Sequence, residues 1–285
     1  MEDRALTATD ATARAYWLLV LGPLAALALL YLYPLATVLW LSVTVPSPGV
    51  GNFAALASSA AVQRIVLTTL RVCLTTTVLA LAIGYLIAYA ALHVRPRHAA
   101  AMLFVVLLCF WLSVLIRAFA WLMLLQSRGV VNTALMAWGV IDAPLALVRN
   151  ELGVVIGMVH YMVPYAVLPL YANMKGIDAR LVPAARGLGA SRWQAFVRVY
   201  LPQSLPGLAA AGILVFIFSL GFYVTPALLG GGKTVMIAEY IALQITDTLN
   251  WGLATALATT LLIAVLAILA AAARVVDLRQ VFGVK

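Results

Sequence analysis

Six long apolar stretches dominate this chain, and they constrain its fold more than any other feature. A helix that crosses a lipid bilayer needs ~20 consecutive apolar residues. Only 9% of the residues are charged, whereas a soluble domain carries about 25%. We therefore predict an all-α membrane protein of six transmembrane helices, with spans near 16–45, 65–92, 99–125, 151–173, 207–229 and 248–273.

The positions of Lys and Arg predict how these spans are oriented, because cytoplasmic connections carry an excess of both residues. One side would hold Arg4, Arg14, Arg95, Arg97, Lys175, Arg180, Arg186, Arg192, Arg198, Arg274, Arg279 and Lys285, and the other Arg64, Arg128, Arg149 and Lys233. The richer side is predicted to be the cytoplasm, and both terminal tails, 1–15 and 274–285, are expected there. Topology thus accounts for the net charge of +9, and we expect no nucleic-acid partner.

The chain is predicted to form one membrane domain, 16–273. Its first apolar stretch is far longer than the ~7–15-residue core of a cleaved signal peptide, so it is expected to remain as a helix. Cys73 and Cys109 both fall within spans. We interpret them as packing residues, and we predict neither a disulfide framework nor a metal site.

One cytoplasmic connection, 175–206, is long, basic and predicted to be folded. Pro183 suits the start of a short helix, where its missing N–H does no harm. Gly189 suits a tight turn after that helix, because glycine readily adopts positive φ. The loop combines apolar and basic side chains, so it is expected either to contact a protein partner or to lie in the lipid headgroups.

A second short helix is predicted in the same connection. Ser191 and Gln194 have the spacing of a capping box, in which each side chain bonds to the backbone of the other residue. Pro202 and Pro206 are expected to end this helix before the fifth span.

The same connection carries a spaced motif made of Pro183, Ala184, Ala185, Gly189, Val199, Leu201 and Pro202. It resembles the signature loop of the permease subunits of bacterial ABC importers. That signature reads Glu-Ala-Ala, three residues, Gly, nine residues, Ile, one residue and Leu-Pro, and the spacing here is the same. The resemblance implies that the motif residues form coupling helices that dock on an ATPase subunit. One position departs from the signature, since Pro183 stands where the family has Glu.

Further stretches resemble the spermidine/putrescine permeases, within a group that also includes importers of opines and other small nitrogenous solutes. They include Trp111-Leu112-Ser113, Gly129-Val130-Val131-Asn132 and Thr225-Pro226-Ala227. The resemblance implies a type I ABC importer permease fold in the bacterial inner membrane, without catalytic residues. It also implies a second homologous permease subunit, two ATPase subunits that bind ATP and Mg, a periplasmic substrate-binding protein and a lipid surround.

Arg117 lies inside the third predicted span. An arginine at membrane depth costs at least ~2.5–3.5 kcal/mol, so this side chain is expected to face protein or water. Two interpretations remain open. Arg117 lines a solute pathway or gate, or it makes a structural bond to helix-end carbonyls or to another subunit.

Aromatic residues and prolines in the third to fifth spans are further candidates for a solute pathway. Prolines at membrane depth free backbone carbonyls, and aromatic rings attract ammonium groups through cation–π contacts. Aromatic residues also serve as packing and interfacial anchors, so the alternative stays open. His160 is interpreted as a packed, hydrogen-bonding residue. The candidate pathway residues are Arg117, Trp121, Tyr161, Tyr165, Phe222, Tyr223 and Pro226.

Other classes of membrane protein are disfavoured. The glycine-rich stretch 230–234 ends like a phosphate-binding loop, but Ala227 occupies its first glycine position, so no ATP site or other cofactor is predicted in this chain. No Asp or Glu lies in the core of a predicted span. A proton-coupled carrier that works alone usually places one there, and the motifs of intramembrane proteases do not occur.

Overall fold

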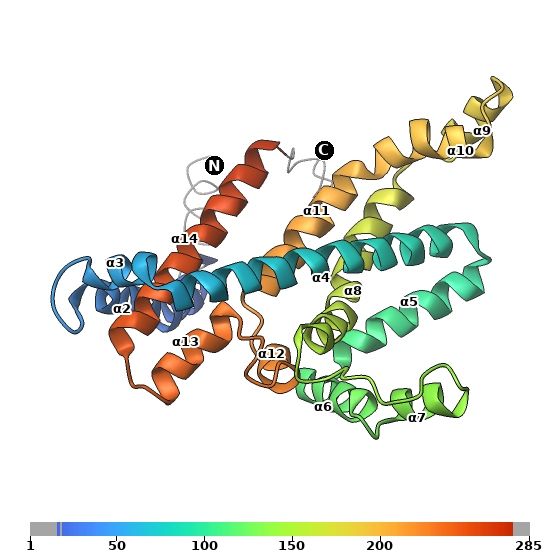
Figure 1. The fold of residues 1–285 in the computed structure, drawn as a ribbon. Helices are drawn as coiled ribbons and strands as arrows, with labels where there is room; N and C mark the ends of the chain where they lie inside the picture. The colour runs from blue at the N-terminus through green and yellow to red at the C-terminus, as the bar shows by residue number, and fades with distance from the viewer. Residues whose placement is uncertain (1–15, 18, 276–285) are drawn as a thin grey trace, which may run out of the picture.

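The computed structural model describes residues 16–17 and 19–275, and helices make up most of this part (Figure 1). Among these residues, six helices are long and apolar enough to cross a membrane, which confirms the predicted all-α architecture. The predicted tail 1–15 lies outside the described residues, as does most of the tail 274–285. The six candidate spans are Leu19–Thr44, Ala60–His93, Val114–Ala137, Glu151–Lys175, Arg192–Leu220 and Trp251–Arg274.

Two segments, η1 and η2, are π-helical and the other elements are α-helices. Their order is η1 Ala28–Leu32, α2 Tyr33–Thr44, α3 Gly51–Ser58, α4 Ala60–His93, α5 Pro96–Trp111, α6 Val114–Leu125, α7 Val130–Ala137, α8 Glu151–Lys175, α9 Leu181–Gly187, α10 Arg192–Ala195, η2 Phe196–Tyr200, α11 Leu201–Leu220, α12 Val224–Leu229, α13 Ile237–Thr246 and α14 Trp251–Val275.

The longest helix, α4, crosses the molecule and packs along α8 and α11 (Figure 1). Small side chains allow this close contact, since Ala80 and Ala88 of α4 and Ala166 of α8 are fully buried. A Cβ atom added at Gly84 would lie 2.8 Å from the Cβ of Ala166. Small residues at crossings let membrane helices approach through their backbones, so Gly84 marks the tightest part of this interface.

Gly84→Leu should therefore force α4 and α8 apart and destabilise the core by ~1–3 kcal/mol or more. We expect a lower melting temperature and a lower yield of monodisperse protein in detergent. Ala82→Leu is the matched control, because Ala82 lies on the exposed side of the same helix. A Gly84→Leu protein with the melting temperature of the wild type would contradict the predicted packing.

The third predicted span, 99–125, is interrupted in the structure. Helix α5 ends at Trp111 and α6 begins at Val114, while Leu112 and Ser113 have extended ψ angles of 131° and 138°. The break exposes backbone groups that no regular helix satisfies. One of them is partnered, since the Leu112 carbonyl accepts a hydrogen bond from Arg117 Nη2 at 3.0 Å.

The fifth predicted span also differs from the expectation. The prediction that Pro202 and Pro206 end a helix is wrong, because one helical segment runs from Arg192 to Leu220. Pro202 lies in the first turn of α11, directly after the π-helical turn η2. A missing N–H is tolerated there, since prolines are accommodated in membrane helices by local π adjustments. The helix instead stops at Leu220, and α12 resumes at Val224.

Short helices cover the end of the bundle away from α9 and α10 (Figure 1). Two of them are α7, which follows α6, and α13, which lies in the segment 230–247 and which the sequence did not reveal. Thr69 joins α13 to α4, because its hydroxyl accepts a hydrogen bond from the Ile237 N–H at 2.9 Å.

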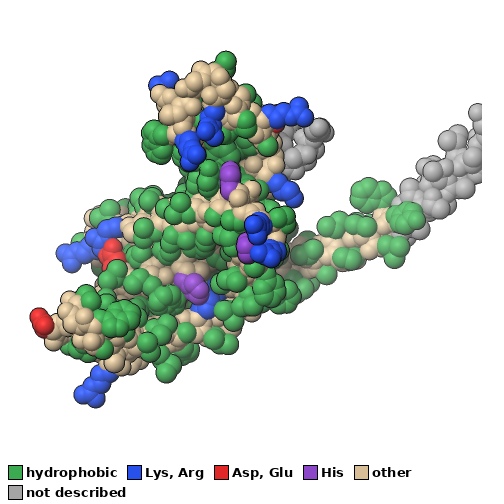
Figure 2. Space-filling view, turned by 90° about the vertical axis from the view of Figure 1, so that its right-hand side faces the viewer, with side chains coloured by type: hydrophobic (Ala, Val, Ile, Leu, Met, Phe, Trp, Pro, Cys, Tyr) green, Lys and Arg blue, Asp and Glu red, His purple; other side chains and the backbone are tan. Residues whose placement is uncertain are grey.

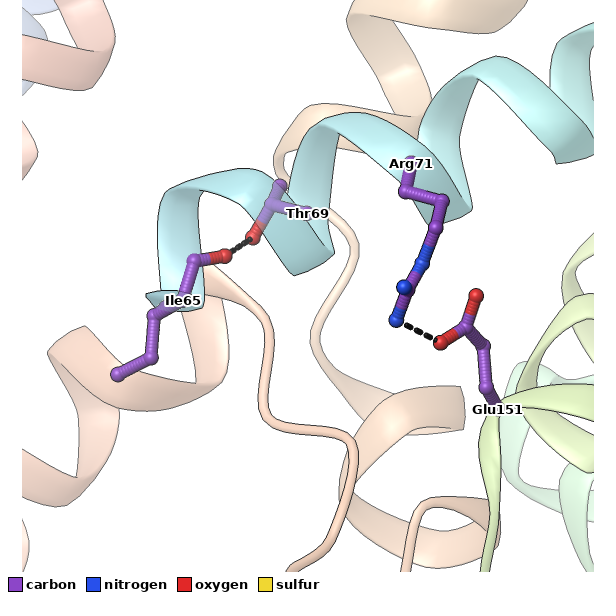
Figure 3. Close-up of polar contacts among 4 residues, drawn as sticks. All are labelled: Ile65, Thr69, Arg71 and Glu151. Atoms are coloured by element: carbon purple, nitrogen blue, oxygen red, sulfur yellow. Dashed lines mark hydrogen bonds and ion pairs between the residues drawn. The ribbon is translucent and has the colours of Figure 1, made fainter. Parts of the chain in front are cut away.

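An ion pair ties α4 to the first turn of α8 at this same end. The Arg71 guanidinium donates to the Glu151 carboxylate, and the two side chains point toward each other in Figure 3. Arg71, which lies within the second predicted span, thus has a carboxylate partner on α8. Cys73, two residues further along α4, is buried and unpaired by any disulfide.

Candidate functional site

The connection 175–206 contains the first predicted short helix, α9, followed by a tight turn. The second predicted short helix is instead the start of a longer one, because α10 runs on through η2 and α11 to Leu220. Helix α9 ends at Gly187, and Gly189 adopts φ +90°, the left-handed conformation expected of it. The capping box is confirmed: the Gln194 N–H donates to Ser191 Oγ at 3.2 Å, and the Ser191 N–H donates to Gln194 Oε1 at 2.9 Å. Pro183 is the third residue of α9 rather than the first, a position where the N–H still lacks a helical partner.

The motif residues lie on the part of the connection that projects from the bundle (Figure 1). Pro183, Ala184, Gly189 and Pro202 are exposed, whereas Ala185, Val199 and Leu201 are half-buried. The turn also presents two large apolar side chains, since Leu188 is 91% exposed and Trp193 is 72% exposed. Exposed apolar side chains at a projecting tip are typical of a protein contact.

Aromatic rings join this connection to the end of α4. Tyr89 contacts Phe196 and Tyr200 edge to face, with ring centroids 5.7 and 5.2 Å apart. The Tyr85 and Ser204 hydroxyls share a hydrogen bond of 2.9 Å. Edge-to-face pairs contribute about 0.5–1.5 kcal/mol each beyond their buried area. These contacts fix the connection against the end of α4.

A second group of candidate residues meets at the break between α5 and α6. Arg117 is 8% exposed, and its guanidinium carbon lies 4.2 Å from the centre of the Tyr161 ring. Together with the bond to the Leu112 carbonyl, this contact gives the buried cation both a hydrogen-bond acceptor and an aromatic face. Arg117 thus has the bond to a helix-end carbonyl that one of the two interpretations expected.

The aromatic cluster extends from Tyr161 to neighbouring rings. Tyr161 lies 4.6 Å from Phe222 and 5.7 Å from Tyr165 between ring centroids. Tyr165 also packs against Phe110 and Phe218. These two residues were not among the candidates that the sequence indicated. Phe218 lies in a continuous apolar stretch, where an aromatic residue is expected to be ordinary packing. Phe110 lies just before the break between α5 and α6, and no Gly or Pro near it predicts that break.

Trp121 and His160 form a neighbouring pair. The Trp121 indole N–H donates to His160 Nδ1 at 3.1 Å, so His160 is the hydrogen-bonding residue that the sequence suggested. Of the other two candidates, Tyr223 is 47% exposed, and Pro226 is buried in α12. No ring contact joins Tyr223 to the aromatic cluster among the described residues.

Two interrupted helices therefore converge on one aromatic cluster. Phe222 belongs to the break between α11 and α12, and Arg117 binds the carbonyl at the break between α5 and α6. Helices interrupted at membrane depth expose backbone groups only where they line a cavity or are covered by protein. Such breaks mark solute sites in many transporters, so this cluster is the candidate pathway element.

The glycine-rich stretch 230–234 forms a turn. Gly231 and Gly232 have φ +59° and +73°, and the Lys233 N–H donates to the Gly230 carbonyl at 3.1 Å. A Cβ at Gly231 would lie 2.5 Å from the Cβ of Arg149, so the turn packs closely on that residue. Within residues 16–17 and 19–275, no three His, Cys, Asp or Glu side chains are grouped as they would be around a metal ion.

Comparison with known proteins gives a consistent assignment. Residues 48–279 match the family described as binding-protein-dependent transport system inner membrane component. The chain is 36% identical over 192 residues to the spermidine/putrescine transport system permease protein PotB of Haemophilus influenzae, which covers 67% of each chain. It is 32% identical over 199 residues to the protein of the same name in Escherichia coli, covering 70% of this chain and 72% of that one.

Solved structures share the fold. A chain of a bacterial ABC transporter involved in the import of the acidic polysaccharide alginate superposes with a TM-score of 0.75 at 20% identity, covering 94% of this chain and 97% of that one. These similarities, together with the six apolar helices, agree with the resemblance seen in the sequence. The chain therefore belongs to the family of binding-protein-dependent transport system inner membrane components, as a multi-pass inner-membrane permease subunit rather than an enzyme.

Proposed function

We propose that this chain forms part of the translocation pathway of an ABC importer for polyamines such as spermidine and putrescine. The observation that carries this proposal is the similarity to spermidine/putrescine permeases at 36% identity over two thirds of the chain. Other rings of the aromatic cluster, Tyr165 and Phe222, support it, since aromatic faces attract ammonium groups, whereas one face of Tyr161 already holds the Arg117 guanidinium. The receptor that delivers the solute is a periplasmic substrate-binding protein.

The connection 175–206 is proposed to couple ATP hydrolysis to transport. Its exposed apolar tip would dock on a separate ATPase subunit, and the aromatic contacts at Tyr89 would carry the movement to α4. The complete importer is proposed to contain a second permease subunit and two ATPase subunits, which bind the ATP and Mg. Conversion between inward-open and outward-open states would then follow the closing of the ATPase pair.

A second class of solute is favoured by a specific observation. The cation at the aromatic cluster is Arg117, whose guanidinium pairs readily with a carboxylate. An opine or an amino-acid-like solute carries such a group, whereas a polyamine does not. We keep this class as the alternative, because a substrate-binding protein or the partner permease can supply the acidic groups that a polyamine needs.

The deciding experiment is uptake by the importer reconstituted with its own partners. We expect ATP-dependent accumulation of radiolabelled spermidine or putrescine, competed by an excess of either polyamine and unaffected by octopine. ATP-dependent accumulation of radiolabelled octopine, without accumulation of either polyamine, would assign the alternative class. Accumulation without any ATPase subunit would reject the ABC importer mechanism in favour of a stand-alone carrier.

The proposed orientation predicts which positions face the periplasm. After Cys109→Ala removes the half-buried thiol, single cysteines at the exposed positions Ser47 and Val140 should react in whole cells with a membrane-impermeant maleimide. Cysteines at Arg97 and Arg192 should react only after the cells are lysed, because the cation-rich side is predicted to be cytoplasmic. Labelling of Arg192→Cys in intact cells would overturn the orientation.

A further inference from the structure

A pocket of about 590 Å³ lies between the coupling connection and the ends of two spanning helices. Volumes of this size are typical of sites for small ligands. Both polar and apolar residues line the pocket. The polar ones include Lys175, Arg186 and Arg192, and the apolar ones include Leu92 and Val182.

The pocket carries an excess of positive charge. Lys175, Arg186 and Arg192 line it, against a single carboxylate, that of Asp178. The Asp178 carboxylate accepts a hydrogen bond from the Arg180 N–H at 2.9 Å, which holds it at the start of α9. Within the described part of the chain the one ion pair is that of Arg71, so none of these three cations is neutralised by a carboxylate at contact distance. Figure 2 shows Lys and Arg side chains gathered around the end of the molecule that carries α9 and α10.

The pocket also lies at one end of the candidate spans, where we expect them to leave the hydrocarbon. Three candidate spans begin or end at residues that line it: α4 ends at His93, α8 ends at Lys175, and the fifth span begins at Arg192. Basic residues at such span ends sit at the level of the lipid phosphates. A basic pocket between membrane helices at this level is typical of a site for anionic lipid headgroups.

We propose that this pocket binds a phosphate ester, with an anionic phospholipid of the adjacent leaflet as its source. The phosphate would contact Lys175, Arg186 and Arg192, and an acyl chain would lie against Leu92 and Val182. A lipid bound in this way joins the ends of α4 and α8 to both sides of the turn at Gly189. The lipid thereby holds the coupling connection at the height where it meets the ATPase. This role is independent of the imported solute.

The test measures the melting temperature of the complete importer in detergent as short-chain lipid is added. Dioctanoyl phosphatidylglycerol should raise the melting temperature in a saturable way, and dioctanoyl phosphatidylcholine should not. Each basic side chain near a lipid surface strengthens anionic lipid binding about fivefold. The double variant Arg186→Gln/Arg192→Gln should therefore need more than ten times as much phosphatidylglycerol for the same rise in melting temperature, because two fivefold losses multiply.

Matched controls come from the same connection. Arg180 and Arg198 are exposed cations that do not line the pocket. Arg180→Gln/Arg198→Gln should respond to phosphatidylglycerol as the wild type does. If the pocket double variant fails to assemble, Lys175→Gln supplies the test, with an expected loss of about fivefold.

Inorganic phosphate and glycerol 3-phosphate distinguish the source of the phosphate. One of them could stabilise the importer at the concentration that phosphatidylglycerol requires, and the pocket variants could lose this stabilisation. The pocket would then be a phosphate site whose ligand is soluble and not a lipid. Equal stabilisation by phosphatidylcholine would overturn the proposal. So would a phosphatidylglycerol response that the pocket variants leave unchanged.

Discussion

Gly189→Asp should abolish ATP-driven uptake while leaving the chain inserted in the membrane. Gly189 has φ +90°, so any side chain there strains the turn between α9 and α10 by ~1 kcal/mol or more. An added Cβ would meet no atom within 4 Å. The damage therefore comes from the backbone conformation and from a new charge beside the apolar tip at Leu188 and Trp193, and the membrane core is spared.

The measurement pairs reconstituted uptake with retention of the ATPase subunits during affinity purification. Gly189→Ala introduces the strain without the charge, so we expect a partial loss of uptake. Gly187→Ala is the matched control, since Gly187 ends α9 without positive φ and also has open space around it. Pro183→Glu should be tolerated, because it restores the family's residue at an exposed position. Normal uptake by Gly189→Asp would remove the coupling role from this connection.

The coupling connection could be predicted in detail because its signals are local. A glycine with positive φ and a Ser–Gln capping box each act within a few residues, and both occur where the sequence placed them. The presence of six apolar spans was similarly readable, since bilayer thickness fixes the length of an uncharged helix. The bounds of the third and fifth spans, however, differ from the expected 99–125 and 207–229. The prediction that Pro202 ends a helix was wrong. A π-helical turn directly precedes this proline, and no short sequence pattern predicts such a turn.

The aromatic cluster could be predicted only in part. Arg117, Tyr161 and Phe222 were singled out for their chemistry, but they come from three separate segments, and only the packing of α6, α8 and α11 brings them together. The break after Trp111 is the second hidden feature. It contains neither Gly nor Pro. The carbonyl that the break exposes accepts a hydrogen bond from the side chain of Arg117, five residues further along the chain.

Arg117→Ala should lower the amount of assembled importer in the membrane. The substitution removes the hydrogen bond that the Arg117 guanidinium donates to the part-buried Leu112 carbonyl, and a hydrogen bond to a charged group contributes about 1.5–3 kcal/mol. It also removes the cation from the face of Tyr161, and the cavity left behind weakens the contact between α6 and α8. Against these losses stands the ~2.5–3.5 kcal/mol saved by removing an arginine from membrane depth. Insertion of the chain itself should therefore continue, and the defect should appear in packing and assembly.

The measurement is the yield and melting temperature of the complex, followed by uptake per assembled complex. Arg117→Lys keeps a charge and a donor but lacks the planar guanidinium, so we expect it to restore assembly only in part. Tyr161→Phe keeps the ring beneath the guanidinium and should assemble normally. If Arg117→Ala assembles fully yet transports at a small fraction of the wild-type rate, the guanidinium acts in the solute pathway, as a positively charged group facing the transported molecule. Full assembly together with full uptake would exclude both roles, and the bond at the helix break would then be dispensable.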